Sequence, residues 1–275
     1  SSTWLSVPVT VPVNVPTVLV AVSSVASPMT SSTSPTAFRI TRLVLRDPHV
    51  FIDAFGCRDA TNTVLGQPGA NAQFQSGIDD YSLNVVSVFR PLAPAMMSTP
   101  VSLYTNGMCM ADAPTDDCSP GGTEVMGTAN NSSSGVCYAA DPTTLTAAYT
   151  APNTPTADPG GMGCFVSSTE TVSISLSGAT ITLENAQVAG EYAGTRIVDG
   201  VIVGFLTFAE ARAAIVPVPI LGDRSLYSLL RSSDTMNGGC GSPPSDADDR
   251  DGDGMEDGWW MYLDFDADEV DWTEP

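Results

Sequence analysis

Apolar and polar residues alternate along most of this chain, and a period of two is typical of β-strands, whose successive side chains point to opposite faces. The alternating runs are rich in Val, Ile, Thr and Phe and are separated by clusters of Gly, Pro, Asn and Asp, which favour turns. Many short strands joined by turns predict an all-β fold, and we expect an antiparallel β-sandwich formed by residues 37–275. The predicted strands are 38–46, 47–57, 83–90, 101–104, 171–176, 179–183, 187–192 and 197–206.

A final strand is predicted at 259–265, where apolar side chains occupy both faces. One face carries Trp259, Met261, Leu263 and Phe265. The other face carries Trp260, Tyr262, Asp264 and Asp266.

Two short helices interrupt the strand pattern. Residues 207–216 begin with Thr207 and carry Glu210 three positions later, which is a capping box, and Pro217 ends the helix. Residues 225–231 are the second candidate.

The first 36 residues are predicted to form an extended arm and linker. Valines at 7, 9, 11, 13 and 15 alternate with other residues, and prolines at 8, 12 and 16 remove backbone donors from one side. The pattern predicts a strand that pairs incompletely. It is more typical of a protected sheet edge, and the alternative is an arm that packs onto a second copy or onto another surface protein.

Charge excludes one broad class of partner. The formal net charge is −21, all ten basic residues are arginines, and they stand at separate positions. Nucleic acid is therefore not an expected partner, because no basic patch is present to neutralise phosphates. Residues 246–275 hold 13 of the 31 acidic residues, yet they also carry three tryptophans, so we expect this acidic segment to be folded.

The six cysteines allow fifteen disulfide pairings, of which we expect Cys109–Cys118, Cys137–Cys164 and, by elimination, Cys57–Cys240. The first two lie in or beside the turn-rich segment 105–163, which we expect to be a disulfide-pinned excursion or insertion. Disulfides persist in oxidising compartments, so an extracellular or cell-surface location is expected. No run of 18 apolar residues occurs, and no transmembrane segment is predicted.

The most specific motif is DRDGDGMED at 249–257, which predicts a calcium loop. Its spacing offers carboxylates from Asp249, Asp251, Asp253 and Asp257 and the backbone carbonyl of Met255, while Gly254 permits the sharp turn. Position 12 of the loop is Trp260 rather than the bidentate glutamate of an EF-hand. We therefore expect weak binding, with a dissociation constant of roughly 10⁻⁴–10⁻³ M.

Catalytic signatures are sparse. The single histidine, His49, lies beside a predicted strand, where we expect a hydrogen-bonded structural residue, and no nucleophile-elbow or phosphate-binding glycine motif is present. A carbohydrate-active protein remains an alternative, because glycoside hydrolysis needs only two suitably spaced acids and a lectin surface could use Trp260, Tyr262 and calcium. The acids available outside the C-terminal segment include Asp53, Asp59, Asp79, Asp80, Glu184 and Glu191.

Four segments resemble a family of uncharacterised secreted proteins of deltaproteobacterial (myxobacterial-type) lineages. They are RDPHVFIDAFGC at 46–57, VFRPL at 88–92, GVIVGFL at 200–206 and DGWWMYLDF at 257–265. The resemblance implies no known activity. The acidic loop is similar to the calcium loops of thrombospondin type 3 repeats, which implies that Asp249, Asp251, Asp253 and Asp257 are ligands, although this chain has one such loop rather than a tandem array.

Together these features predict a non-enzymatic, extracellular, calcium-stabilised protein. It would be a structural component of the cell surface, or a subunit of an envelope or filament assembly. The alternative is a carbohydrate-active protein, either a lectin or a glycoside hydrolase.

Overall fold

The long strands of this chain close into a barrel. A computed structural model describes residues 34–53, 56–112, 114–158, 161–176, 179–218, 221–233 and 245–274. Nearly all of the predicted N-terminal arm, and Cys240 of the third predicted disulfide, lie outside these residues. No helix among the described residues has the length and apolar character needed to cross a membrane.

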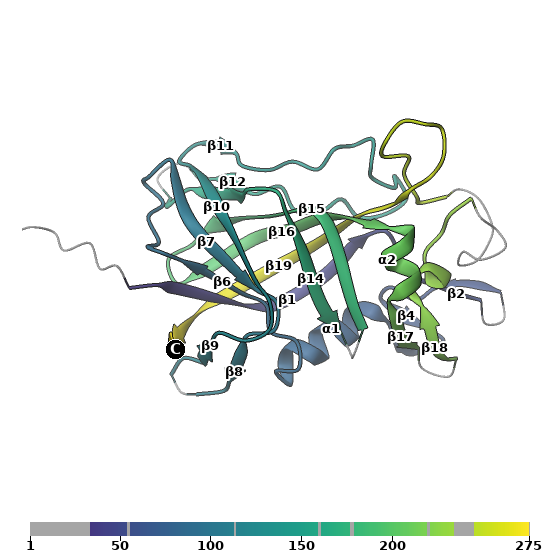
Figure 1. Ribbon diagram of the computed structural model, residues 1–275, viewed down its shortest axis with the longest axis horizontal. Coiled ribbons are helices and arrows are strands. Elements are labelled where there is room, and N and C mark those ends of the chain that lie inside the picture. Colours follow the sequence, from purple (N-terminus) through teal and green to yellow (C-terminus); the bar gives the residue numbers. More distant parts are fainter. Residues whose placement is uncertain are drawn as a thin grey trace, which may run out of the picture. The chain divides into compact units, whose positions relative to one another are not determined.

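Eight strands form the barrel, and every neighbouring pair is antiparallel. The ring closes because β19 pairs with β16 on one side and with β1 on the other, and Figure 1 shows β19 lying between these two strands. In ring order the strands are β1 (Thr36–Asp47), β6 (Val86–Phe89), β7 (Ser98–Tyr104), β10 (Glu124–Ser132), β13 (Cys164–Ser167), β15 (Ala179–Tyr192), β16 (Arg196–Thr207) and β19 (Gly258–Trp272).

The predicted all-β, mainly antiparallel class is confirmed, but the predicted sandwich is wrong. Alternation shows which face of a strand is buried and does not show whether the sheet closes on itself. Closure here uses long strands that bend at irregular positions, with register shifts at Ile40/Arg42 in β1, Ala189/Glu191 in β15 and Ile197/Gly200 in β16. Such bulges increase the twist and curvature that a barrel needs.

The face assignment of β19 is confirmed. Trp259, Met261, Leu263 and Phe265 belong to the main core, whereas Tyr262 packs in a separate cluster on the outer face, with Trp260 beside it. At one end of the barrel the interior is filled by aromatic rings. The ring centroid of Phe89 lies 5.9 Å from that of Phe38, 5.3 Å from that of Phe165 and 5.8 Å from that of Tyr192.

Two disulfide-linked flaps cover parts of the outer face, and both predicted pairs within them are confirmed. Cys109–Cys118 joins β8 (Met108–Met110) to β9 (Asp117–Ser119), and β9 pairs with the end of β19. Cys137–Cys164 anchors residues 135–157, which we call the strap. Tyr138 and Leu145 of the strap pack on the cluster around Tyr262. The barrel strand β10 lies between these flaps, so it divides the segment 105–163 that was expected to be one excursion.

Helices lie at the margins of the barrel. In α2 (Phe208–Ala213), the Thr207 hydroxyl accepts a hydrogen bond from the Glu210 N–H at 3.2 Å, which confirms the predicted cap. The second predicted helix is a single 3-10 turn, η1 (Leu226–Leu229). The sequence pattern did not predict α1 (Ala70–Asp79), because Ile78 is its one fully buried residue and the apolar stripe is weak.

Smaller strands complete the fold. β14 (Glu170–Leu176) pairs with β15 outside the ring. Two short strand pairs precede α1 in the chain: β2 (Phe51–Asp53) with β3 (Cys57–Asp59), and β4 (Thr63–Val64) with β5 (Gln67–Pro68). A third pair, β17 (Ile215–Val218) with β18 (Gly222–Ser225), precedes η1. A further short pair joins β11 (Gly135–Val136) to β12 (Thr156–Ala157) in the strap.

Candidate functional site

The acidic loop directly precedes β19, the strand that closes the barrel. Its base is held by an antiparallel bridge in which the Asp248 N–H donates to the Gly258 carbonyl and the Asp257 N–H donates to the Asp248 carbonyl, both at 2.8 Å. The Asp257 carbonyl also accepts from the Phe208 N–H at the start of α2. The loop is therefore attached to the barrel strand β19 and to the helix α2 before any ion is considered.

Three of the predicted ligands converge. One carboxylate oxygen from each of Asp249, Asp251 and Asp257 lies within 4.8 Å of the other two. Backbone N–H groups orient two of these carboxylates: Asp249 accepts from Gly254 at 2.7 Å, and Asp257 accepts from Arg250 at 2.9 Å. Gly254 has a φ of +91°, which is the left-handed backbone that the loop motif requires at this position.

The other two predicted ligands are arranged differently. The Asp253 carboxylate lies outside the three-carboxylate cluster and accepts a hydrogen bond from the Met255 N–H at 2.8 Å. The Met255 side chain is 67% exposed, and the predicted ligand is its backbone carbonyl. Within the described loop, the geometry thus groups Asp249, Asp251 and Asp257 and leaves Asp253 and Met255 beside them.

Charged contacts fasten the loop to the barrel wall. Arg250 Nη1 lies 2.8 Å from Glu184 Oε2 on β15, and its guanidinium lies over the ring of Phe205 at 4.7 Å. At the base of the loop, partial burial raises the pKa of Asp248 to about 6. Three loop carboxylates with converging oxygens repel one another, and a divalent cation with oxygen ligands relieves such repulsion.

Three acids of β19, namely Asp264, Asp266 and Asp268, form ion pairs with arginines on the strands at either side. Asp264 is fully buried, with Oδ2 2.5 Å from Arg46 Nε of β1. Asp268 Oδ1 lies 2.6 Å from Arg196 Nε of β16, at a directly opposed position in the ladder. The expected folding of the acidic segment thus rests on cross-strand ion pairs as well as on its aromatic residues.

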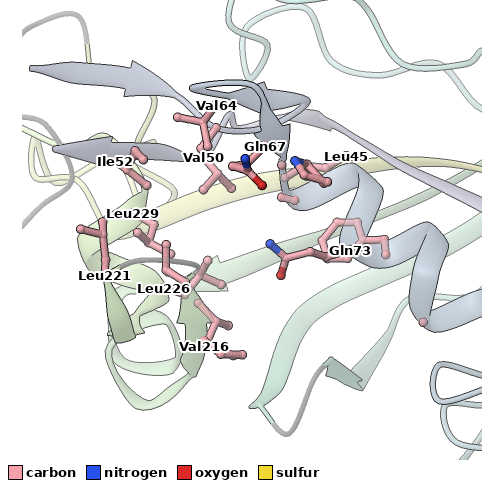
Figure 2. Close-up of a pocket in the computed structure, with 18 of the residues that line it drawn as sticks. Leu45, Val50, Ile52, Val64, Gln67, Gln73, Val216, Leu221, Leu226 and Leu229 are labelled. Carbon is pink, nitrogen blue, oxygen red and sulfur yellow. The ribbon is translucent and has the colours of Figure 1, made fainter. Parts of the chain in front are cut away.

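An apolar cavity of about 150 Å³ lies at the end of the barrel opposite the aromatic rings. Leu45 of β1, Ile181 of β15 and Met261 of β19 line it from the barrel interior. Side chains of α1, of the β2–β5 region and of the β17–β18–η1 region form its other walls, as Figure 2 shows. The described residues that line it include no charged side chain.

The size of this cavity is unusual for a packing imperfection. Protein interiors contain few voids larger than a water molecule. An apolar space of this size at the open end of the barrel is therefore a candidate binding site.

A third polar cluster surrounds His49. Its Nδ1 lies 2.6 Å from Asp59 Oδ2, and its ring stacks on Tyr149 with centroids 3.5 Å apart. The expectation of a hydrogen-bonded histidine is thus confirmed. The Tyr149 hydroxyl donates to Asp246 at 2.7 Å, and burial raises the pKa of Asp246. Although burial acts in the opposite direction, the hydrogen bonds from His49 and Thr61 leave the pKa of Asp59 lowered.

The two aromatic residues considered for a lectin surface are covered to different extents. Tyr262 is 2% exposed and its hydroxyl is hydrogen-bonded to the Thr144 hydroxyl at 2.6 Å beneath the strap. Trp260 packs edge-on against Phe205 and is half-buried.

Comparison of the chain with protein-family models, with curated proteins and with solved structures finds no match. The resemblance of the four segments therefore stays a prediction, and the argument for function rests on the geometry above.

Sequence reasoning did not identify the cavity or the arginine partners of β19. The cavity wall combines residues from Leu45 to Met261, and none of its segments carries a motif. The arginines stand singly in the sequence, so their shared role becomes visible only in the strand register. The sequence signal that could have indicated the cavity is Leu65-Gly66, between two short β-runs. There a large apolar residue occupies a turn position that usually holds Asn or Asp.

Proposed function

We propose that this chain is a non-enzymatic extracellular protein in which calcium, bound by the loop at 249–257, clamps the closing strand of the barrel. The observation that carries the proposal is the convergence of the Asp249, Asp251 and Asp257 carboxylates immediately before β19. An ion held there neutralises repulsion at the point where β19 enters the ring between β16 and β1. Its role is structural, because it secures the strand that completes the fold.

The compartment supports this proposal. Cys109–Cys118 and Cys137–Cys164 indicate an oxidising environment, and extracellular modules bind calcium at roughly 10⁻⁴–10⁻³ M. A loop without the bidentate glutamate of an EF-hand suits a compartment where calcium is abundant. Asp253 and the Met255 carbonyl would complete the coordination after a small adjustment of the loop.

Thermal unfolding in calcium and in chelator tests the clamp. With a dissociation constant of roughly 10⁻⁴–10⁻³ M, 10 mM calcium stabilises the fold by about 1.4–2.7 kcal/mol, and the melting temperature rises with calcium concentration. Asp249→Asn should abolish most of this shift. Asp223→Asn, which removes an exposed carboxylate on β18, is the matched control and should retain it. Equal melting temperatures of the wild-type chain in calcium and in chelator would refute the proposal.

The proposal extends to a role at the cell surface, in an envelope or in a filament, with the Val/Pro arm as the contact element. That arm lies outside the described residues, so its support comes from the sequence pattern alone. Light scattering of the full chain and of a variant lacking residues 1–22 tests it. A monodisperse monomer in both cases would exclude the assembly role without affecting the calcium clamp.

A further inference from the structure

We propose that the cavity between α1, η1 and the open end of the barrel is a binding site for a small, neutral, mainly apolar molecule that carries one hydrogen-bonding group. An eight-stranded barrel has an interior just wide enough for its side chains or for one small ligand. Here the two ends of the interior differ. Phe38, Phe89 and Phe165 pack together at one end, whereas the other end holds the cavity beyond Leu45 and Met261.

The size and lining of the cavity define the ligand class. An apolar space of 150 Å³ matches cavities that bind a single aromatic ring, and apolar residues form most of the wall. No described lining residue carries a cation to pair with a carboxylate or phosphate, and the net charge of −21 disfavours anions further. A neutral ligand is therefore favoured over a fatty acid or a phosphorylated molecule.

The polar side chains in the wall include Gln73, whose amide is available to a ligand. Figure 2 shows the Gln73 side chain extending from α1 toward Leu226. The neighbouring Gln75 uses both amide N–H donors, which reach the Thr41 carbonyl at 3.0 Å and Asp79 at 2.8 Å. The Gln73 amide has no hydrogen bond to any residue in the described part of the chain. A buried hydroxyl or carbonyl of a ligand would satisfy it.

The rim of the cavity carries an exposed apolar residue in an unfavourable backbone conformation. Leu65, in the tight turn between β4 and β5, has a φ of +52° and is 52% exposed. Leucine rarely adopts this conformation, and its side chain gains little from folding when it is half in water. Contact with an apolar ligand at the cavity mouth accounts for a leucine at this position.

The test compares binding of benzyl alcohol, toluene and benzoate to the full chain in calcium-containing buffer by ligand-observed NMR titration. We expect saturable one-to-one binding of benzyl alcohol at about 1 mM or tighter, and binding of benzoate at least tenfold weaker. Gln73→Leu should weaken benzyl alcohol several-fold and leave toluene unchanged or tighter. Because all titrations contain calcium and a fold check, failure of the calcium clamp does not affect the outcome.

A matched pair of variants locates the site. Val216 lines the cavity from β17, whereas its neighbour Ile215 is on the opposite face of the strand and 48% exposed. Val216→Trp should reduce binding at least tenfold, and Ile215→Trp should not change it. If Val216→Trp fails to fold, crystals of the wild-type chain under xenon pressure should show xenon in the cavity. Absence of saturable binding of both benzyl alcohol and toluene, equal binding by the two tryptophan variants, or a xenon-free cavity would overturn the proposal.

Discussion

Asp47 should make the stability of this protein decrease as the pH rises through the mildly acidic range. Asp47 ends β1 and is only 3% exposed. Its Oδ2 accepts a hydrogen bond from the Thr146 N–H at 2.6 Å, and Oδ1 accepts from the Thr146 hydroxyl at 3.2 Å. Burial, with a smaller contribution from the charge of Asp246, raises the pKa of Asp47 to about 6 in spite of these hydrogen bonds.

The sign of the effect follows from the direction of the shift. In the unfolded chain the carboxyl has a pKa of 3.8, so between pH 4 and 6 the folded form of Asp47 retains a proton that the unfolded form has released. The stabilisation is thus complete below about pH 4, decreases as the pH rises from 4 to 6, and is lost above about pH 6. At 1.36 kcal/mol per pKa unit, the free energy of unfolding decreases by at most about 3 kcal/mol over this range.

Asp47→Asn isolates this contribution, because asparagine still accepts from the Thr146 N–H and cannot ionise. Urea unfolding, followed by tryptophan fluorescence at pH 4, 5, 6 and 7, gives the free energy of unfolding for the wild type and the variant. The wild type minus variant difference should fall by up to about 3 kcal/mol from pH 4 to pH 7. Asp223→Asn, at an exposed position, controls for general charge effects. A difference that stays constant or increases with pH would refute the reasoning.

Two further predictions concern the barrel interior and its closing strand. Arg46→Met leaves the fully buried Asp264 carboxylate without its cation and should reduce the free energy of unfolding by about 3–5 kcal/mol. Adding Asp264→Asn should recover part of this loss, because the Asn153 N–H keeps its acceptor. Equal stabilities of the single and double variants by urea unfolding would contradict this. A Cβ at Gly200 would lie 2.5 Å from the Phe265 ring, so Gly200→Ala should reduce the free energy of unfolding by about 1–3 kcal/mol. Adding Phe265→Leu should relieve part of this loss, whereas additive losses in the double variant would show that the ring is not the obstacle.

Local pattern was sufficient to predict those features that depend on neighbouring residues. The faces of β19, the Thr207 cap and the Cys109–Cys118 pair all follow from period, spacing or short separation in sequence. The two strands predicted at 179–183 and 187–192 are instead one strand, β15, since Asn185 with a φ of +51° marks an irregularity in the ladder that looks like a break in the sequence pattern.

Features that depend on distant pairings could not be predicted in this way. Arg42 is paired with Asp266, and this register closes the barrel across most of the described chain. The same closure places Leu45 and Met261 at one cavity. The acidic loop was predicted in part. Its spacing predicted the converging carboxylates of Asp249, Asp251 and Asp257. It did not indicate that the Asp253 carboxylate would instead accept a hydrogen bond from the Met255 N–H.

The position of β19 in the chain has a consequence for biogenesis. It is the last of the eight barrel strands to leave the ribosome, and until it arrives β1 and β16 each expose a row of unpaired N–H and C=O groups. Every nascent chain therefore passes through a state with two open edges, which is prone to pairing with other chains. Premature stops before residue 258 should accordingly yield aggregates rather than a smaller soluble protein.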